Sequence, residues 1–211
     1  MTKLAWLPQP LKRLVRLQRD AMRRIGQRRA LKAMAQAGSR KIIIGSSGTR
    51  MQGWTPTDQE LIDLLVDDSW GAFFSPASID AILAEHVWEH LSADEGRRAA
   101  VTCHRYLKPG GFLRVAVPDG FHPDPAYIRA VKPPADDHKM LYTFSGFRDL
   151  FAEAGFDVTL LEYFDEQARF QFNDWNAQDG LIRRSKRFDP RNANGHFGYT
   201  SIILDATKPK N

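Results

Sequence analysis

The sequence contains few of the features that mark secreted, membrane-spanning or zinc-binding proteins. Its 211 residues include one cysteine, Cys103, so no disulfide can form within the chain and no zinc site can be built from cysteines. No run of about 18 apolar residues occurs, which excludes a membrane span. The first ten residues hold no continuous apolar region of the kind found in secretory signals. These absences predict a cytoplasmic protein.

Acidic residues are nearly missing from the start of the chain. Residues 1–41 carry 12 Lys and Arg but one acid, Asp20, whereas the remainder carries 18 basic and 24 acidic residues. The net charge of +5 therefore reflects the N-terminal segment and not the rest of the protein. Apolar residues in this segment recur at helical spacing and predict a basic amphipathic helix. They are Leu11, Leu14, Val15, Met22 and Ile25.

We expect two parts, a helical arm over residues 1–38 and an α/β domain over residues 39–211. The arm can pack on its own domain or on a second subunit in a homodimer, or it can attach to an anionic surface. Trp6 would suit peripheral contact with the inner face of a membrane. The main domain has no basic stripe with stacking aromatic residues, which disfavours nucleic acid as a partner.

Strand-like and helix-like segments alternate in the main domain. The pattern predicts strands over residues 41–45, 53–57, 79–85 and 112–117. Before the last of these, Ser92 and Glu95 form a capping box, and the helix that they start ends at Pro109-Gly110-Gly111. A strand, a helix and another strand make a βαβ unit, so we expect these strands to be parallel.

The C-terminal part is expected to add one helix and two strands. The helix is predicted over residues 144–154 and ends at Gly155, and the strands cover residues 156–164 and 199–207. Because no clear helix separates the two strands, we expect them to pair antiparallel at an edge of the sheet. About thirty polar and aromatic residues lie between them, and so long a loop in a compact domain is usually functional.

The loop after the first strand is short and lacks one common nucleotide-binding sequence. It contains no G-x-G-x-x-G, which disfavours an NAD-dependent oxidoreductase, and residues 46–53 are too few for a crossover helix. Ligands of open α/β sheets nevertheless bind at the carboxyl ends of strands, where Gly45 and Gly48 allow close backbone approach. Ser46 and Ser47 add hydroxyl groups at the same strand end.

Four segments in order resemble the class I S-adenosylmethionine-dependent methyltransferases, in particular a branch of small prokaryotic members. They are IIIGSSGT, GWTPTD, IDAILAEHVWEHL and RYLKPGGFLRVAVPDG. The resemblance extends over residues 41–207 and implies an α/β, Rossmann-like sheet, mostly parallel with an antiparallel last strand and helices on both faces. It also implies a methyl-transferring enzyme with S-adenosylmethionine as the cofactor. The chain departs from the family where Ser47 occupies a usual glycine position.

The candidate cofactor site follows from the strand ends and from the resemblance. A carboxylate at Asp58, after the second strand, can accept both ribose hydroxyls, and Asp63, Asp67 and Asp68 compete for contacts to the nucleoside. The resemblance implies that residues 85–91 face the methionine part of the cofactor. The expected cofactor-binding residues are Gly45, Ser46, Ser47, Gly48, Asp58, Glu85 and His86.

The expected catalytic groups are His86, His90 and Asp119, although His90 can instead serve only to begin a helix. His138 and Lys139 lie in a segment where a substrate lid is expected, and Arg184 and Arg187 belong to a basic cluster. That cluster is either a solvated loop or a clamp for an acidic acceptor, since Arg pairs bidentately with phosphate or carboxylate. No metal ion is expected.

The acceptor is a small molecule or a glycan, and the resemblance points to sugar- or polysaccharide-associated enzymes. Methyl transfer from a sulfonium is an in-line displacement, so the protein mainly supplies positioning and in some cases a base. A second hypothesis is a non-catalytic relative that acts as a binding or scaffold protein through its basic arm.

Overall fold

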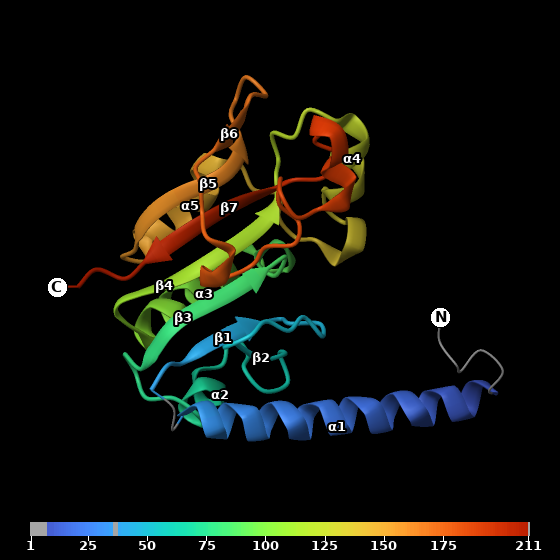
Figure 1. The fold of residues 1–211 in the computed structure, drawn as a ribbon, viewed down its shortest axis with the longest axis vertical. Coiled ribbons are helices and arrows are strands. Elements are labelled where there is room, and N and C mark those ends of the chain that lie inside the picture. The colour runs from blue at the N-terminus through green and yellow to red at the C-terminus, as the bar shows by residue number, and fades with distance from the viewer. Residues whose placement is uncertain (1–7, 36–37, 211) are drawn as a thin grey trace.

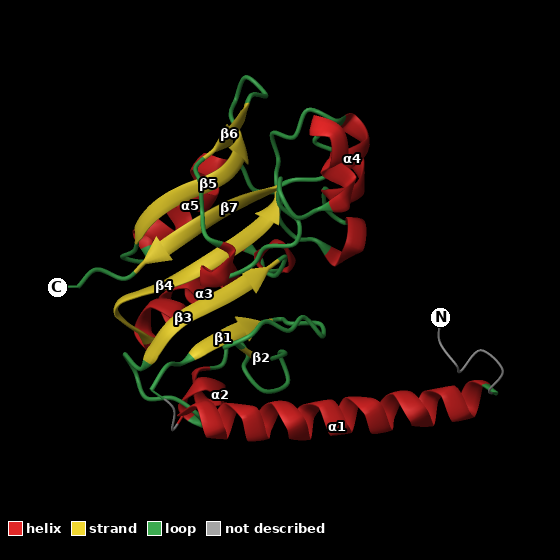
Figure 2. Cartoon of the chain, viewed as in Figure 1, coloured by secondary structure: helices red, strands yellow, loops and turns green. Residues whose placement is uncertain are grey.

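One twisted sheet forms the centre of the protein in the computed structural model, which describes residues 8–35 and 38–210 (Figure 1). Within these residues the sheet has seven strands in the order β2-β1-β3-β4-β7-β5-β6. The strands are β1 Lys41–Ile44, β2 Thr55–Pro56, β3 Ile79–Glu85, β4 Leu107–Pro118, β5 Asp157–Phe164, β6 Phe170–Phe172 and β7 Ser201–Thr207. Figure 2 shows them as a continuous yellow layer.

The strand directions confirm the mostly parallel sheet. β2, β1, β3 and β4 are mutually parallel, and β7 runs antiparallel to both β4 and β5. β5 and β7 pair antiparallel as expected, but they are not the edge of the sheet. β6, which the sequence did not predict, lies at that edge, while β7 is inserted between β4 and β5. The apolar side chains of Ile202, Ile203 and Leu204 suit this position, because both faces of an inner strand are covered.

The described helices have the bounds α1 Gln9–Ala35, α2 Asp67–Gly71, α3 Ala93–Tyr106, α4 Pro125–Val131 and α5 Phe144–Glu153. The capping box that begins α3 is confirmed, since Ser92 and Glu95 exchange both hydrogen bonds. α3 ends earlier than predicted, and β4 begins directly at Leu107. Gly111 makes this start feasible, because a side chain there would meet the backbone oxygen of Asp80 at 2.9 Å.

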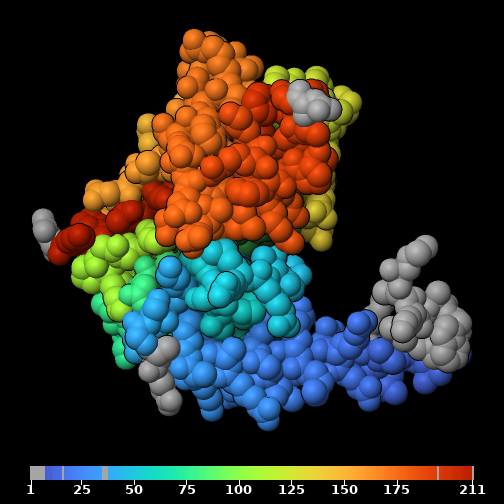
Figure 3. Space-filling model, viewed as in Figure 1, coloured from blue at the N-terminus to red at the C-terminus, as the bar shows by residue number. Residues whose placement is uncertain are grey.

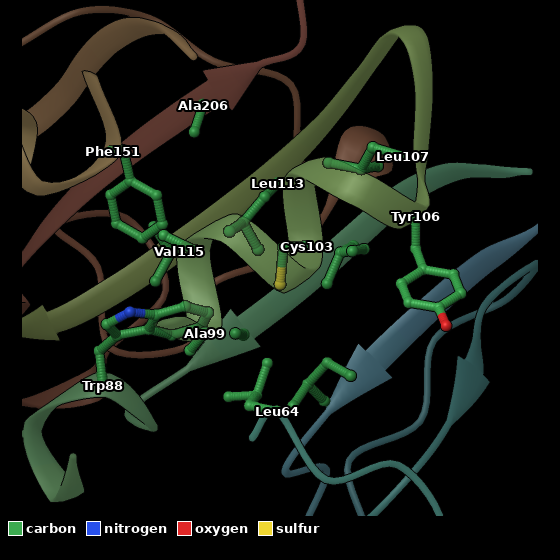
Figure 4. Close-up of a cluster of buried hydrophobic side chains, with 14 of the residues drawn as sticks. Leu64, Trp88, Ala99, Cys103, Tyr106, Leu107, Leu113, Val115, Phe151 and Ala206 are labelled. Atoms are coloured by element: carbon green, nitrogen blue, oxygen red, sulfur yellow. The ribbon is translucent and has the colours of Figure 1, made fainter. Parts of the chain in front are cut away.

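The larger core lies between the sheet and helices α3 and α5 (Figure 4). Trp88 is fully buried there, with its ring centre 5.4 Å from that of Phe151. Cys103 of α3 is also fully buried, and burial raises the pKa of its thiol. The core therefore fixes the segment around Trp88, which follows the carboxyl end of β3 and carries several candidate site residues.

The second face of the sheet is covered differently from the prediction of helices on both faces. A smaller core contains Ile43, Leu83, Trp175 and Ile182. In the described part of the chain, the segment over this face carries only the short 3-10 helix η3, Ala177–Asp179, and no α-helix. Its side chains, rather than a regular helix, supply the apolar cover.

Helix α1 belongs to the main domain over its C-terminal half only. Gln27, Leu31 and Met34 are buried against the domain. The N-terminal half continues beyond the body of the protein (Figures 1 and 3). Five large apolar side chains between residues 11 and 25 are about half exposed or more, namely Leu11, Leu14, Leu17, Met22 and Ile25. None of the described helices is long and apolar enough to cross a membrane. Residues 1–7 of the predicted arm, with Trp6, lie outside the described residues.

Candidate functional site

Two adjoining hollows lie at the carboxyl ends of β1 and β3. The first has a volume of about 290 Å³ and the second of about 490 Å³. They share five lining residues, namely Ile44, Gly45, Ser47, His86 and His90. We call them the first and the second cavity. Parallel neighbouring strands bring their loops to the same edge of the sheet, so the position agrees with the general location of ligand sites in such folds.

The loop after β1 turns sharply, and glycine is needed at its first position. Gly45 has φ +59°, and a side chain there would approach Cγ2 of Val87 to 2.8 Å. Gly48 also has a positive φ, of +88°, but nothing lies within 4 Å of its missing side chain. Ser47, in the usual glycine position of the family, has φ +43°. Its conformation is uncommon for a residue with a side chain and marks a backbone held in place by its surroundings.

Asp58 is bonded to this loop, and both of its carboxylate oxygens already have partners within the protein. Its Oδ1 accepts hydrogen bonds from Ser46 Oγ and from the Ser47 backbone N–H, both at 3.0 Å. Its Oδ2 accepts from Gln27 at 2.9 Å and lies 3.1 Å from the Arg23 guanidinium. Burial alone would raise the pKa of Asp58, but these hydrogen bonds and the Arg23 charge outweigh it and lower the pKa. Asp58 lines neither cavity.

Glu85 lies at the end of β3 and faces the first cavity. Its Oε1 accepts the Arg184 backbone N–H at 2.8 Å, and the guanidinium groups of Arg184 and Arg183 lie 3.7 and 3.8 Å from its oxygens. The C-terminal segment is thus attached to the strand end by a buried carboxylate. Arg183 also donates to Thr49 Oγ1 at 2.7 Å, which connects that segment to the loop after β1.

His86 follows Glu85 with φ +57°, a conformation that turns the chain out of the sheet. Its Nε2 lies 2.9 Å from Ser201 Oγ, whose own hydrogen is donated to the Arg184 carbonyl at 2.8 Å. Nε2 therefore carries the proton of that contact. Nδ1 lies 3.1 Å from Glu89 Oε1. Both ring nitrogens of His86 face partners within the protein.

Glu89, His90 and His138 meet at the boundary of the first cavity. One ligand-capable atom from each lies within 4.8 Å of the other two. Glu89 is on the 3-10 helix η1, Trp88–His90, and its side chain is completely buried. Glu89 was not among the predicted site residues. Its position directly after a tryptophan and directly before a histidine is the feature of the sequence that could have indicated it.

The remaining predicted residues lie apart from the first cavity or at its margin. Lys139 lines the second cavity and pairs with Glu95 at 2.9 Å. Arg187 lines neither cavity and lies over Trp175, with its guanidinium 3.2 Å from Asp174. Arg183, which belongs to the same basic cluster but was not selected, does line the first cavity.

Asp119 is fully buried and lines neither cavity. Its oxygens accept the backbone N–H groups of Phe121 at 2.9 Å and Phe164 at 2.7 Å. Burial raises the pKa of Asp119 to about 6, although these two hydrogen bonds oppose the shift. The carboxyl group joins the end of β4 to the end of β5.

This raised pKa predicts a pH-dependent stability. In the folded protein the Asp119 carboxyl keeps its proton up to a higher pH than in the unfolded chain. The free energy of unfolding is therefore expected to fall as the pH rises from about 4 to about 6. A shift of two units corresponds to about 2–3 kcal/mol. Urea unfolding at several pH values measures the slope, and Asp119→Asn should remove this part of it. An unchanged slope in that variant would contradict the assignment.

The chain is similar to one family model and to solved structures of methyltransferases. Residues 26–115 match a family model described as a methyltransferase domain. No curated protein matches the chain significantly. A crystal structure of an S-adenosylmethionine-dependent methyltransferase from Archaeoglobus fulgidus is similar in fold, with a TM-score of 0.51 and 14% identity over 88% of this chain and 94% of that one. One from Mesorhizobium loti gives 0.48 and 15% over 85% and 96%.

Proposed function

We propose that the chain is a class I S-adenosylmethionine-dependent methyltransferase that methylates an anionic small molecule or glycan at the first cavity. One observation carries this proposal: the cavity has two chemically different sides. The loop Gly45–Thr49 presents backbone and hydroxyl groups on one side, and Arg183 and Arg184 present positive charge on the other. The first side suits the cofactor and the second an acidic acceptor.

The residues at the end of β1 fit the methionine end of the cofactor. Gly45 leaves room for backbone contact, Thr49 offers a hydroxyl, and Glu85 offers a carboxylate that can accept from an amino group. Gly48 lines neither cavity. The two cavities together lie within the usual range of about 300–1,000 Å³ for small-molecule sites. When bound, S-adenosylmethionine supplies a methyl group on a positively charged sulfur, and the protein must orient the acceptor toward it.

In this proposal Asp58 accepts hydrogen bonds from the ribose hydroxyls, but only after one of its oxygens has lost a partner. Since four groups already surround its oxygens, Gln27 or Arg23 of α1 must release one oxygen before a hydroxyl can donate to it. Asp63, which lines the second cavity, is the alternative.

Gln27 tests this assignment. We expect Gln27→Ala to bind S-adenosylmethionine about two- to tenfold more tightly, because it removes one of the two partners of Asp58 Oδ2 without touching the loop, and such a hydrogen bond contributes about 1 kcal/mol. Asp58→Ala should bind at least tenfold more weakly. Calorimetric titration measures both. If the two variants lose affinity to the same extent, Asp58 serves only to hold the loop.

The acceptor side is assigned to Arg183, Arg184 and His138. Both arginines remain partly exposed at the cavity, where a guanidinium can pair bidentately with a carboxylate or phosphate. His86 and His90 line the same cavity and are the candidates for receiving the acceptor proton. Lys139 and Arg187 are expected to contribute less to acceptor binding, since neither lines this cavity.

Calorimetry and product mass spectrometry test the proposed function. We expect binding of S-adenosylmethionine and S-adenosylhomocysteine, and methyl transfer to sugar phosphates or uronic acids in preference to neutral sugars. Arg184→Gln should raise the acceptor KM, while Arg187→Gln, a matched arginine outside the cavity, should not. No detectable cofactor binding at millimolar concentration would instead support a non-catalytic binding protein.

A second proposal concerns the arm, which we assign to contact with an anionic membrane surface. The exposed half of α1 combines apolar residues with Lys12, Arg13 and Arg19, a composition that suits interfacial helices. This would place the protein peripherally on a membrane.

Vesicle sedimentation tests the arm. The double variant Leu14→Glu/Leu17→Glu is expected to lose most binding to phosphatidylserine vesicles, at least tenfold, because it removes apolar area and adds negative charge. Val101→Glu, which changes an exposed apolar residue on α3, is the control and should bind normally. If the wild type does not bind vesicles but forms a dimer that the double variant cannot form, the arm is a subunit interface.

A further inference from the structure

We propose that Glu89, His90 and His138 bind a divalent transition-metal ion at the wall of the first cavity. The three side chains supply one carboxylate and two imidazoles, a donor set that suits Zn²⁺, Fe²⁺ or Co²⁺ better than Mg²⁺ or Ca²⁺, which prefer oxygen ligands alone. The site does not require methyl transfer to occur, so the two proposals can fail separately.

The state of Glu89 is the first reason. Its side chain is 0% exposed, and neither carboxylate oxygen has a hydrogen-bond partner among the described residues. His86 Nδ1 lies 3.1 Å from Oε1 without a hydrogen bond between them, and it is a positively charged partner only if both ring nitrogens are protonated. Leaving a buried polar group without a partner is costly, and more so when it is charged, so an unpaired carboxylate facing a cavity calls for a positively charged ligand.

The orientation of the two histidines is the second reason. His138 Nδ1 lies 2.6 Å from the Val131 carbonyl oxygen, and His90 Nδ1 lies 3.4 Å from that of Asp137. A carbonyl only accepts, so in each ring Nδ1 is the donor and Nε2 is left to bind a ligand. Histidines that bind metals commonly donate their other ring N–H to a backbone carbonyl in this way.

The backbone holds the ligands together before any ion arrives. The N–H groups of Lys139 and Met140 both donate to the Glu89 carbonyl, at 2.7 and 3.0 Å. The rings of His90 and His138 meet edge to face with centres 4.9 Å apart. Ligands bonded at about 2.1 Å can be no more than about 4.2 Å apart, so the 4.8 Å spread needs only a small contraction.

Three protein ligands leave at least one coordination position open. All three residues line the first cavity, so an open position there can hold water or an acceptor oxygen. A bound divalent ion lowers the pKa of such an oxygen and would favour its deprotonation. With an ion bound, His90 would be a ligand and His86 would face the Glu89 carboxylate, so neither would receive the acceptor proton as assigned above for the metal-free protein.

Cobalt titration of untagged, chelator-treated full-length protein tests the proposal. We expect one Co²⁺ per chain, a visible absorption band from the coordinated ion, and competition by Zn²⁺. His90→Asn and Glu89→Gln should each weaken binding at least 10–100-fold, since changes even in supporting partners have effects of that size. His196→Ala, at an exposed histidine outside the cluster, is the matched control and should bind as the wild type does.

His90 is only partly buried, so its variant keeps the test valid if Glu89→Gln does not fold. Thermal unfolding of the metal-free proteins identifies a folding defect. The proposal is overturned if the wild type shows no coordinated-cobalt band, or if His90→Asn binds cobalt as tightly as the wild type. The cobalt band reports on the ion alone, so its loss in His90→Asn would support the metal site whether or not the protein transfers methyl groups.

Discussion

Arg114→Met is expected to lower the free energy of unfolding by about 3 kcal/mol, because it breaks a buried ion pair from one side. The Arg114 side chain is 3% exposed in the middle of β4. Its Nε and Nη2 donate to the two carboxylate oxygens of Asp205 on β7, at 2.8 and 2.7 Å. The third guanidinium nitrogen donates to the carbonyls of Asn176 and Gly180. Methionine fills similar space but leaves these acceptors without a donor.

The same substitution should disturb the acceptor side of the cavity. Asn176 and Gly180 belong to the segment that leads to Arg183 and Arg184, and Arg114 is one of the side chains that attach this segment to the sheet. Urea unfolding measures the stability, and Arg105→Met is the control. Arg105 pairs with Asp67 on the surface, where both side chains are about half exposed, so its loss should cost no more than about 0.5 kcal/mol. Equal losses in the two variants would contradict this account.

Gly45→Ala is expected to weaken S-adenosylmethionine binding by about 10–100-fold. A side chain at φ +59° costs about 1–2 kcal/mol, and this one would also meet Val87 Cγ2 at 2.8 Å. The loop must move to accommodate both, and it lines both cavities. Calorimetric titration with the cofactor measures the effect.

Two further variants separate the causes. Gly53→Ala introduces a methyl group at φ +79° with nothing within 4 Å and outside both cavities, so it should bind the cofactor normally. Val87→Ala removes the clashing methyl and should restore part of the affinity when combined with Gly45→Ala. Absence of any rescue, or an equal loss in Gly53→Ala, would show that close packing at Gly45 does not matter for binding.

Much of the sheet could be predicted because its signals are local. The strand over residues 79–85 is continuous and apolar, and the capping box at Ser92 depends on residues three positions apart. β6 was missed because three residues of mixed character become a strand only by pairing with β5. The early start of β4 was missed because its glycines were interpreted as a stop, whereas close approach to Asp80 explains Gly111.

For the site, the sequence by itself determined which strand ends border the cavities: Gly45 to Gly48, Glu85, His86 and His90 all line one of the two cavities or belong to the loop beside them. Only the tertiary structure decided which partners these residues meet. Asp58 is bound by Gln27 from a helix 31 positions earlier, Arg187 turns toward Trp175, and Glu89 meets His138 in a buried cluster. The physical reason is that strand ends follow from local hydrophobic patterns, whereas hydrogen-bond partners and burial depend on segments that folding brings together from far apart in the chain.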